Sequence, residues 1–327
     1  MKIRFGYVAM SMVLKDCSPS RTVTATNLEK IAEREIRISK LTRLARQNLR
    51  NTRRLLYHNS AHDISVYRFT SRLIPLATHP LTSGWNWKED LKDELRSLGD
   101  YVKERGFRVS AHPDHFTLLN SPRNEVVEKS LEDLEYHNSI FQGMGLDGLA
   151  KLVIHVGGLY RDKEQSTKRF VENFSALPAY IRDRITLEND DRTYTTADVL
   201  EICRKIHVPM VLDIHHHWCN GGGTDLESLL EGVFDTWKGQ SLVPKIHLSS
   251  PKDRKNFRGH ADYIDSAFFV DFLETAKKTR QNFDVMLEAK NKDLALFKLM
   301  KDLESIKWIK FLDQASIEVS GHCKCNL

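Results

Sequence analysis

Eight short apolar runs, rich in β-branched residues, recur along the sequence, and polar stretches and segments of helical periodicity separate them. This alternation is typical of βα units, whose strands lie parallel in one sheet. Eight such units in 327 residues predict an α/β fold, a closed (β/α)8 TIM barrel, for which about 250 residues is typical. The runs cover residues 3–9, 64–70, 107–113, 150–157, 185–190, 209–217, 244–249 and 283–290.

The sequence offers no point at which to divide this barrel. No Pro-, Gly- or Ser-rich linker interrupts it, and its content of 41% apolar and 28% charged residues excludes a disordered chain. No period of about 20 to 50 residues repeats, which argues against solenoids and propellers. We expect one barrel domain at 1–310, helices such as 91–105, 126–144 and 292–303, and a C-terminal tail at 311–327.

Charge and cysteine content indicate a cytoplasmic protein. The net charge of +5 is a mild bias toward an anionic partner. Five scattered cysteines, an odd number, do not suggest a disulfide framework. The N-terminus imitates a signal peptide, but Lys15 and Asp16 interrupt it and no cleavage site of small residues follows. No apolar run approaches the roughly 20 residues of a membrane helix, so we expect no membrane partner.

Residue types that bind metals end six consecutive runs of the predicted barrel. Barrel enzymes keep their chemistry at these carboxyl ends. A lone histidine there is usually a hydrogen-bonded core residue, and a lone glutamate a helix cap, but six in succession indicate a shared site. In chain order the residues are His112, His155, Glu188, Asp213 with His216 and His217, His247 and Glu288.

Side-chain alternation favours a common position for these groups. Residues two apart share a strand face, so the last residue of each run can point into the barrel mouth. Carboxylates and imidazoles gathered there without a cation would leave buried charges unpaired. The donor set, which lacks thiolate, suits Mn²⁺, Zn²⁺ or Fe²⁺. Two ions about 3.5–4 Å apart are a standard device for phosphoryl chemistry, and Glu188 is a candidate bridge between them.

Lys245 lies two residues before His247 and therefore on the same strand face. An ammonium group beside metal ions is electrostatically unfavourable. If the side chain points inward, we expect a neutral amine, a carboxylated Nζ or a contact with phosphate. The alternative is a lysine whose stem packs while its amine reaches solvent.

Basic segments indicate where a polyanion would bind. Eight lysines and arginines occupy residues 34–54 against one acid, Glu35, although such runs are often solvated helix faces. A second group follows the seventh run, on the side of the barrel where substrates bind. Trp85 and Trp87 could stack on bases or anchor a long loop. The second basic group consists of Lys252, Arg254, Lys255 and Arg258.

With these residues in view, the sequence resembles the UV damage endonuclease family, a DNA-repair group on a barrel similar to that of endonuclease IV. The resemblance extends over roughly residues 3–310. Its landmarks are Arg4-Phe-Gly-Tyr7, Asn48-Leu-Arg-Asn-Thr52, Tyr67-Arg-Phe69, Leu76-Ala-Thr-His79-Pro80, His112-Pro113, His155-Val-Gly-Gly158, Leu187-Glu-Asn-Asp190, Asp213 to His217, Pro244-Lys-Ile-His-Leu-Ser-Ser250, His260-Ala-Asp262 and Leu287-Glu-Ala-Lys290.

The resemblance implies a role for each matching position. One metal would lie on His112, His155 and Glu188, and a second on Glu188, Asp213, His247 and Glu288. A third site would use His216 and His260, with Lys245 nearby. Two or three ions are thus implied, with Mn²⁺ preferred over Zn²⁺ or Fe²⁺. Glu188, Lys245 and His79 would be catalytic, and the DNA contacts would be Tyr7, Arg68, His115, Phe116, Lys252 and Arg254.

One position departs from the family pattern. Where the family commonly has Gln followed by Tyr or Phe to probe the base stack, this chain has His115 and Phe116. Phe116 keeps an apolar surface that can act as a wedge. His115 keeps hydrogen-bonding capacity, and we expect the exchange to alter lesion preference.

The resemblance therefore implies a hydrolase that nicks DNA on the 5′ side of UV photoproducts, and also at abasic sites, leaving 3′-hydroxyl and 5′-phosphate ends. Its partner would be damaged duplex DNA, and we expect a monomer without an obligate protein partner. The alternatives are an abasic-site endonuclease, a divalent-metal sugar isomerase, against which the basic segment argues, and a DNA-binding barrel without activity, against which the ligand set argues.

Overall fold

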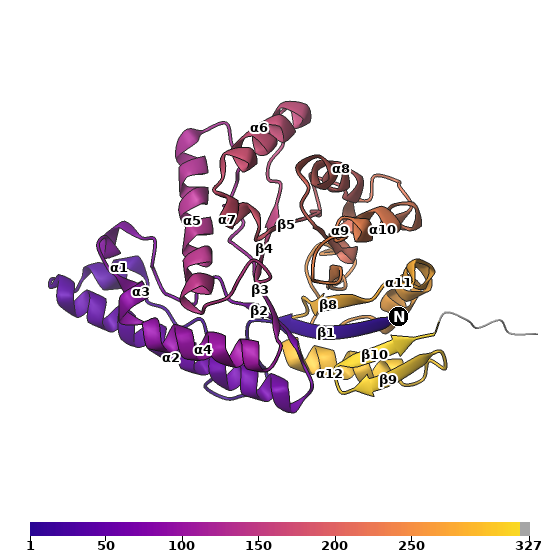
Figure 1. Cartoon of the computed structure of the whole chain (residues 1–327), viewed down its shortest axis with the longest axis horizontal. Coiled ribbons are helices and arrows are strands. Elements are labelled where there is room, and N and C mark those ends of the chain that lie inside the picture. Colours follow the sequence, from indigo (N-terminus) through magenta and orange to yellow (C-terminus); the bar gives the residue numbers. More distant parts are fainter. Residues whose placement is uncertain (321–327) are drawn as a thin grey trace, which may run out of the picture.

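Each of the eight predicted runs overlaps a strand in the computed structural model, which describes residues 1–320. All eight strands are parallel, and β1 pairs with both β8 and β2, which closes the barrel (Figure 1). The predicted TIM barrel is confirmed. The strands are β1 (Lys2–Val8), β2 (Val66–Phe69), β3 (Arg108–Ala111), β4 (Lys151–His155), β5 (Ile185–Glu188), β6 (Met210–Asp213), β7 (Lys245–Leu248) and β8 (Phe283–Leu287).

Helices connect the strands and cover the outside of the barrel. Their ends follow local signals, as at Thr195, which forms a capping box with Asp198 at the start of α8. Within residues 1–320, none of the helices combines the length and apolar character needed to cross a membrane. The helices are α1 (Ala25–Glu29), α2 (Arg34–Ala61), η1 (Pro80–Thr82), α3 (Trp87–Asp90), α4 (Lys92–Glu104), α5 (Asn124–Gly143), α6 (Lys163–Ala176), α7 (Ala179–Arg182), α8 (Thr196–Ile206), α9 (Ile214–Asn220), α10 (Leu226–Asp235), α11 (Ser266–Ala276), η2 (Lys277–Thr279) and α12 (Lys292–Leu303).

A C-terminal hairpin extends the sheet beyond the barrel. Strands β9 (Ile309–Asp313) and β10 (Ser316–Val319) pair with each other, and β10 pairs antiparallel with the start of β1. Ile317 and Val319 are buried by this pairing. The tail that we expected from residue 311 therefore does not begin there, because these residues belong to the sheet. Cys323 and Cys325, two of the five cysteines, lie outside the described residues.

Side chains fill the barrel interior at the end opposite the mouth, where the strands begin. Arg4 and Arg108 both donate to the carboxylate of Asp284, at distances of 2.6–2.7 Å. Trp237 lies beneath Arg108, with its ring centroid 5.0 Å from the guanidinium carbon, and its Nε1 donates to the carbonyl of Met210. Because this end is closed by packed residues, the mouth is the place left for chemistry.

Candidate metal centre

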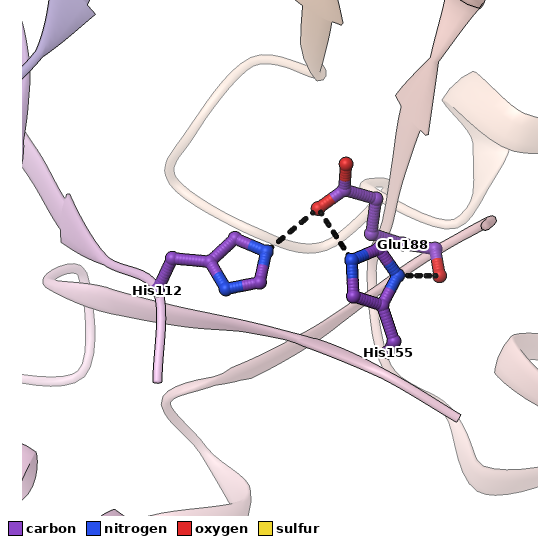
Figure 2. A group of neighbouring side chains, drawn as sticks. All are labelled: His112, His155 and Glu188. Atoms are coloured by element: carbon purple, nitrogen blue, oxygen red, sulfur yellow. Dashed lines mark hydrogen bonds and ion pairs between the residues drawn. The ribbon is translucent and has the colours of Figure 1, made fainter. Parts of the chain in front are cut away.

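Glu188, at the end of β5, is the central residue of the mouth. Its side chain is 1% exposed, and its Oε2 lies 3.1 Å from His112 Nε2 and 3.9 Å from His155 Nε2. Figure 2 shows both imidazoles pointing at this oxygen. The other oxygen, Oε1, lies 3.0 Å from His247 Nδ1 and 3.6 Å from His216 Nδ1. The two oxygens of one carboxylate therefore face two different sets of imidazoles, as a bridging ligand requires.

A second set of donors surrounds the Oε1 side. Ligand atoms of Glu188, Asp213, His247 and Glu288 lie within 4.8 Å of one another, as do those of His112, His155 and Glu188. Asp213 Oδ2 and His247 Nε2 are buried without a hydrogen-bond partner among the described residues. Buried polar atoms are rarely left unpaired, so the donor set fits divalent cations. The structure thus brings together the ligands implied for the first two metals.

The local fold explains how Asp213 enters this set. The predicted strand at 209–217 ends at Asp213, where α9 begins. One carboxylate oxygen of Asp213 caps that helix by accepting a hydrogen bond from the backbone N–H of His216 at 2.7 Å. The cap fixes the carboxylate and leaves Oδ2 unpaired.

Four histidines share a second feature of metal ligands. In each, Nδ1 lies close to a backbone carbonyl, to which it can donate. A metal-binding histidine usually donates its other ring N–H in this way, which fixes the ring and frees the second nitrogen. The carbonyl partners are Pro113 for His112 (2.9 Å), Glu188 for His155 (3.3 Å), Asn189 for His216 (2.9 Å) and Glu288 for His260 (2.8 Å).

His216 and His260, expected at a third site, also lie close together. Their ring centroids are 6.3 Å apart, and both approach carboxylates of the cluster. His216 Nδ1 is 3.9 Å from Asp213 Oδ2, and His260 Nδ1 is 3.8 Å from Glu288 Oε2. The third group is therefore contiguous with the second.

Carboxylates and imidazoles in the mouth shift one another's pKa values. Burial alone would raise the pKa of Glu188, but the imidazoles of His247 and His155 hold it well below its ordinary value. Burial would lower the pKa of His216, whereas Asp213 and Glu188 raise it to about 9. The Glu188 carboxylate is therefore ionised at neutral pH, and the imidazole of His216 supplies compensating positive charge.

Lys245 lies deeper inside the barrel than the metal-ligand cluster, two residues before His247 on β7. It is 2% exposed, and its Nζ donates to Ser110 Oγ at 3.0 Å. Burial, together with the nearby charges of Arg108 and Arg68, lowers the pKa of the amine well below its ordinary value. The inward orientation is confirmed, and the solvent-reaching alternative is wrong for this residue.

The six predicted DNA contacts fall into two groups: five are accessible or lie beside the cluster, and one, Tyr7, is buried. Arg68 forms an ion pair with Glu288 at the mouth. Phe116, 52% exposed, and His115 project from the loop after β3. Lys252 and Arg254 are exposed in the loop after β7. These five residues are accessible or lie beside the cluster.

Tyr7 does not fit its expected place beside the damaged strand. It is completely buried, its hydroxyl donates to Asn59 Oδ1 at 2.5 Å, and its ring packs edge-on against Tyr67. The cause is strand parity: Arg4 points into the barrel interior, so Tyr7, an odd number of residues later, points outward against α2. Direct contact with DNA at this position is therefore corrected to a packing role.

Two further expectations concern the loop after β2. His79 caps η1, and its Nδ1 accepts a hydrogen bond from the backbone N–H of Leu81 at 3.1 Å. Among the described residues, no hydrogen bond or ion pair joins His79 to the cluster, so its catalytic role stays a prediction. Trp85 and Trp87 are 8% and 7% exposed. They anchor the loop, and the alternative that they stack on bases is wrong.

Sequence reasoning missed Trp218. This indole is 54% exposed in α9, two residues after His216. No sequence pattern marks it, because a single tryptophan in a short helix can equally well be buried. Only its surroundings in the structure show that it belongs to the mouth.

The fold and the mouth define the class: a TIM-barrel protein whose mouth gathers histidines and carboxylates that fit divalent metal ions around Glu188. A family model described as UV-endonuclease UvdE matches residues 3–320. A UV DNA damage endonuclease of Bacillus cereus (strain 03BB102) is 43% identical over 318 residues, which cover 97% of this chain and 100% of the relative. The corresponding protein of Bacillus cereus (strain G9842) is 44% identical over the same length. The chain therefore belongs to the UvdE family.

Solved structures agree with this assignment. The crystal structure of SacUVDE has a TM-score of 0.82 and 34% sequence identity, covering 93% of this chain and 99% of that one. The apo form of 3-keto-D-glucoside 4-epimerase, YcjR, from E. coli has a TM-score of 0.55 at 13% identity. At that identity the second likeness shows the shared barrel fold alone.

Proposed function

We propose that this chain is a metal-dependent endonuclease that nicks DNA immediately 5′ of UV photoproducts and also acts at abasic sites. The products are a 3′-hydroxyl and a 5′-phosphate. The observation that carries the proposal is the position of Glu188, whose two oxygens face separate imidazole sets in a chain of the UvdE family. The relatives named UV DNA damage endonuclease support the choice of substrate.

The donor sets assign residues to two or three ions. His112, His155 and Glu188 would hold the first, and Glu188, Asp213, His247 and Glu288 the second. His216 and His260 would contribute to a third. When bound, Mn²⁺, or alternatively Zn²⁺ or Fe²⁺, supplies charge that polarises a phosphodiester and lowers the pKa of water.

Residues around the centre position the DNA. Arg68 would exchange its ion pair with Glu288 for a phosphate once cations neutralise that carboxylate. Phe116 would insert at the lesion, where weakened stacking makes separation of the bases least costly. Lys252 and Arg254 would contact the backbone. We infer a cytoplasmic monomer that acts without an obligate protein partner.

One assay tests this function against its alternatives. Irradiated, abasic and undamaged duplexes are incubated with the protein in Mn²⁺ or in chelator, and the ends are mapped. We expect metal-dependent incision of the irradiated duplex. Incision of the abasic duplex alone would instead support an abasic-site endonuclease, and equal incision of undamaged DNA would contradict damage recognition.

A variant tests the central carboxylate. Glu188→Gln should bind fewer metal ions per chain by elemental analysis and lose at least about 100-fold in nicking rate, while DNA affinity changes little. Glu304→Gln, at the far end of α12, is the matched control. Near-normal turnover of Glu188→Gln would refute the bridging assignment.

A further inference from the structure

The exposed indole of Trp218 rests on a fixed support. Its ring stacks on that of His215, with centroids 6.0 Å apart and planes inclined by 28°. His215 is itself immobilised, because its Nδ1 lies 2.8 Å from Ser249 Oγ and its Nε2 lies 2.7 Å from the carbonyl of Phe257. The ring of Phe257 meets the indole edge-on at 6.1 Å. We call these three residues, Trp218, His215 and Phe257, the aromatic platform.

Cations adjoin the aromatic platform. Arg258 lies over the ring of Phe257, with its guanidinium carbon 4.6 Å from the centroid. Lys252 and Arg254 are exposed in the same loop. Aromatic rings beside cationic side chains are the composition of surfaces that bind unpaired nucleic acid, since bases stack on the rings while phosphates meet the charges.

The aromatic platform also has a counterpart across the mouth. It follows β6 and β7, whereas the exposed Phe116 follows β3. The intervening strands β4 and β5 end in His155 and Glu188, so the metal-ligand cluster lies between the two aromatic elements. DNA centred on the cluster would therefore meet an exposed ring on each side.

We propose that the aromatic platform binds an unstacked nucleobase of the DNA, with Trp218 as the stacking surface. This inference rests on the proposed function, because it takes DNA to occupy the mouth. Damage lowers the cost of separating bases from the stack. A base displaced on the side away from Phe116 then exchanges its lost stacking for contact with the indole.

Fluorescence tests the stacking without any damage recognition. Single-stranded oligothymidylate should quench part of the tryptophan emission of the wild type in metal-free buffer. The Trp218→Phe variant should lack this component, because Trp85, Trp87 and Trp237 are buried. The fifth tryptophan, Trp308, is half-buried beneath Lys277 just before β9, at the end of the barrel opposite the mouth. Equal quenching in wild type and variant, or no quenching in either, would overturn the inference.

Affinity provides the second measurement. Trp218→Ala should weaken binding of irradiated duplex by about 5- to 150-fold, the range for loss of one aromatic stacking contact. Trp218→Phe should keep most of the affinity, and binding of undamaged duplex should change less. Tyr180→Ala is the matched control, since Tyr180 is 48% exposed in α7, just before β5 and far from the mouth.

The outcomes separate the two hypotheses. If the wild type nicks irradiated DNA but Trp218→Ala binds it as tightly as the wild type does, the aromatic platform is refuted and the proposed function stands. If oligothymidylate quenches Trp218 but no irradiated duplex is incised, the proposed function fails and the stacking surface stands. A Trp218→Ala chain that fails to fold leaves the decision with Trp218→Phe.

Discussion

Replacing Arg43 and Arg50 in α2 with glutamine should reduce the salt dependence of DNA binding. Helices α2 and α4 run in the same direction, because Arg46 pairs with Glu94 and Arg53 binds Ser97 further along. Residues 34–45 of α2 therefore extend beyond the start of α4, on the side of the mouth. At 1.5 Å per residue this extension measures about 18 Å. Together with Arg46 and Arg50 in the next turns of α2, this extension forms a basic wall beside the site where we expect DNA.

The structure identifies which cations of this wall are free. Arg34 and Arg46 donate to the carbonyls of Ser83 and Asp90 and hold the loop after β2. Arg43 and Arg50 are exposed and make no hydrogen bond or ion pair among residues 1–320. They can contact phosphate without giving up an internal partner.

The expected magnitude follows from counterion release. Each phosphate contact contributes about 0.9 to the slope of log affinity against log salt, so two lost contacts reduce the slope by about 1.8. Between about 50 and 200 mM salt the affinity ratio of wild type to variant should fall about 12-fold.

Fluorescence anisotropy with a duplex that extends past α2 measures these slopes. Arg105→Gln with Arg280→Gln removes the same charge at the opposite end of the barrel, just before β3 and β8, and serves as the control. If the α2 variant keeps the wild-type slope, or if the control lowers it equally, α2 does not contact the DNA backbone.

Three further variants test the interior and the lesion loop. Asp284→Asn should lower the free energy of unfolding by about 3 kcal/mol or more in urea, because Arg4 and Arg108 lose their shared buried carboxylate; a loss under about 1 kcal/mol would contradict this. Burial lowers the pKa of His137 to about 3. Only the unfolded chain then takes up the proton, so the free energy of unfolding should fall by about 1.6 kcal/mol between pH 6.5 and pH 5. His137→Gln should lack this part of the pH dependence. A slope shared by wild type and variant would refute the assignment. Phe116→Ala should weaken binding of irradiated duplex about tenfold with little effect on undamaged duplex, and equal losses on both would exclude a lesion-specific wedge.

Much of the barrel and of its metal-ligand cluster was predictable, because period-two alternation shows which residues share the inner face of a strand and how close each lies to the mouth. Asp284, Met286 and Glu288 follow one another up the inner face of the last barrel strand, and Lys245 and His247 do the same on the strand before it. Residues that bind metals at successive strand ends then have to meet at the mouth. The helix expected at 292–303 also has its predicted ends, because its apolar positions repeat at helical spacing.

The remaining features depend on information that alternation does not carry. Phe5, Gly6 and Tyr7 are all buried, so polarity does not reveal which of them faces the barrel interior. That ambiguity misplaced Tyr7. The C-terminal hairpin was missed because its strands are short and are stabilised by pairing with the distant start of β1, which no local pattern indicates. Exposure of Trp218 is likewise a tertiary property.

Lys245 allows the electrostatic reasoning about the barrel interior to be tested. Its buried amine contacts only Ser110 Oγ among the described hydrogen-bond partners, and nearby arginines oppose its protonation. If the amine is neutral, Lys245→Met removes one hydrogen bond and no charge, so the free energy of unfolding should change by less than about 1.5 kcal/mol. Nicking should nevertheless fall, because the substitution removes from the wild-type chain the uncharged amine that donates to phosphate or that attacks carbon dioxide, supplied by ¹³C-labelled bicarbonate, to form a carbamate with release of a proton. A loss of stability above about 3 kcal/mol would instead indicate an ion-paired ammonium. A carbamate signal that appears in the ¹³C spectrum of the wild type and not in that of the variant would identify the carboxylated form.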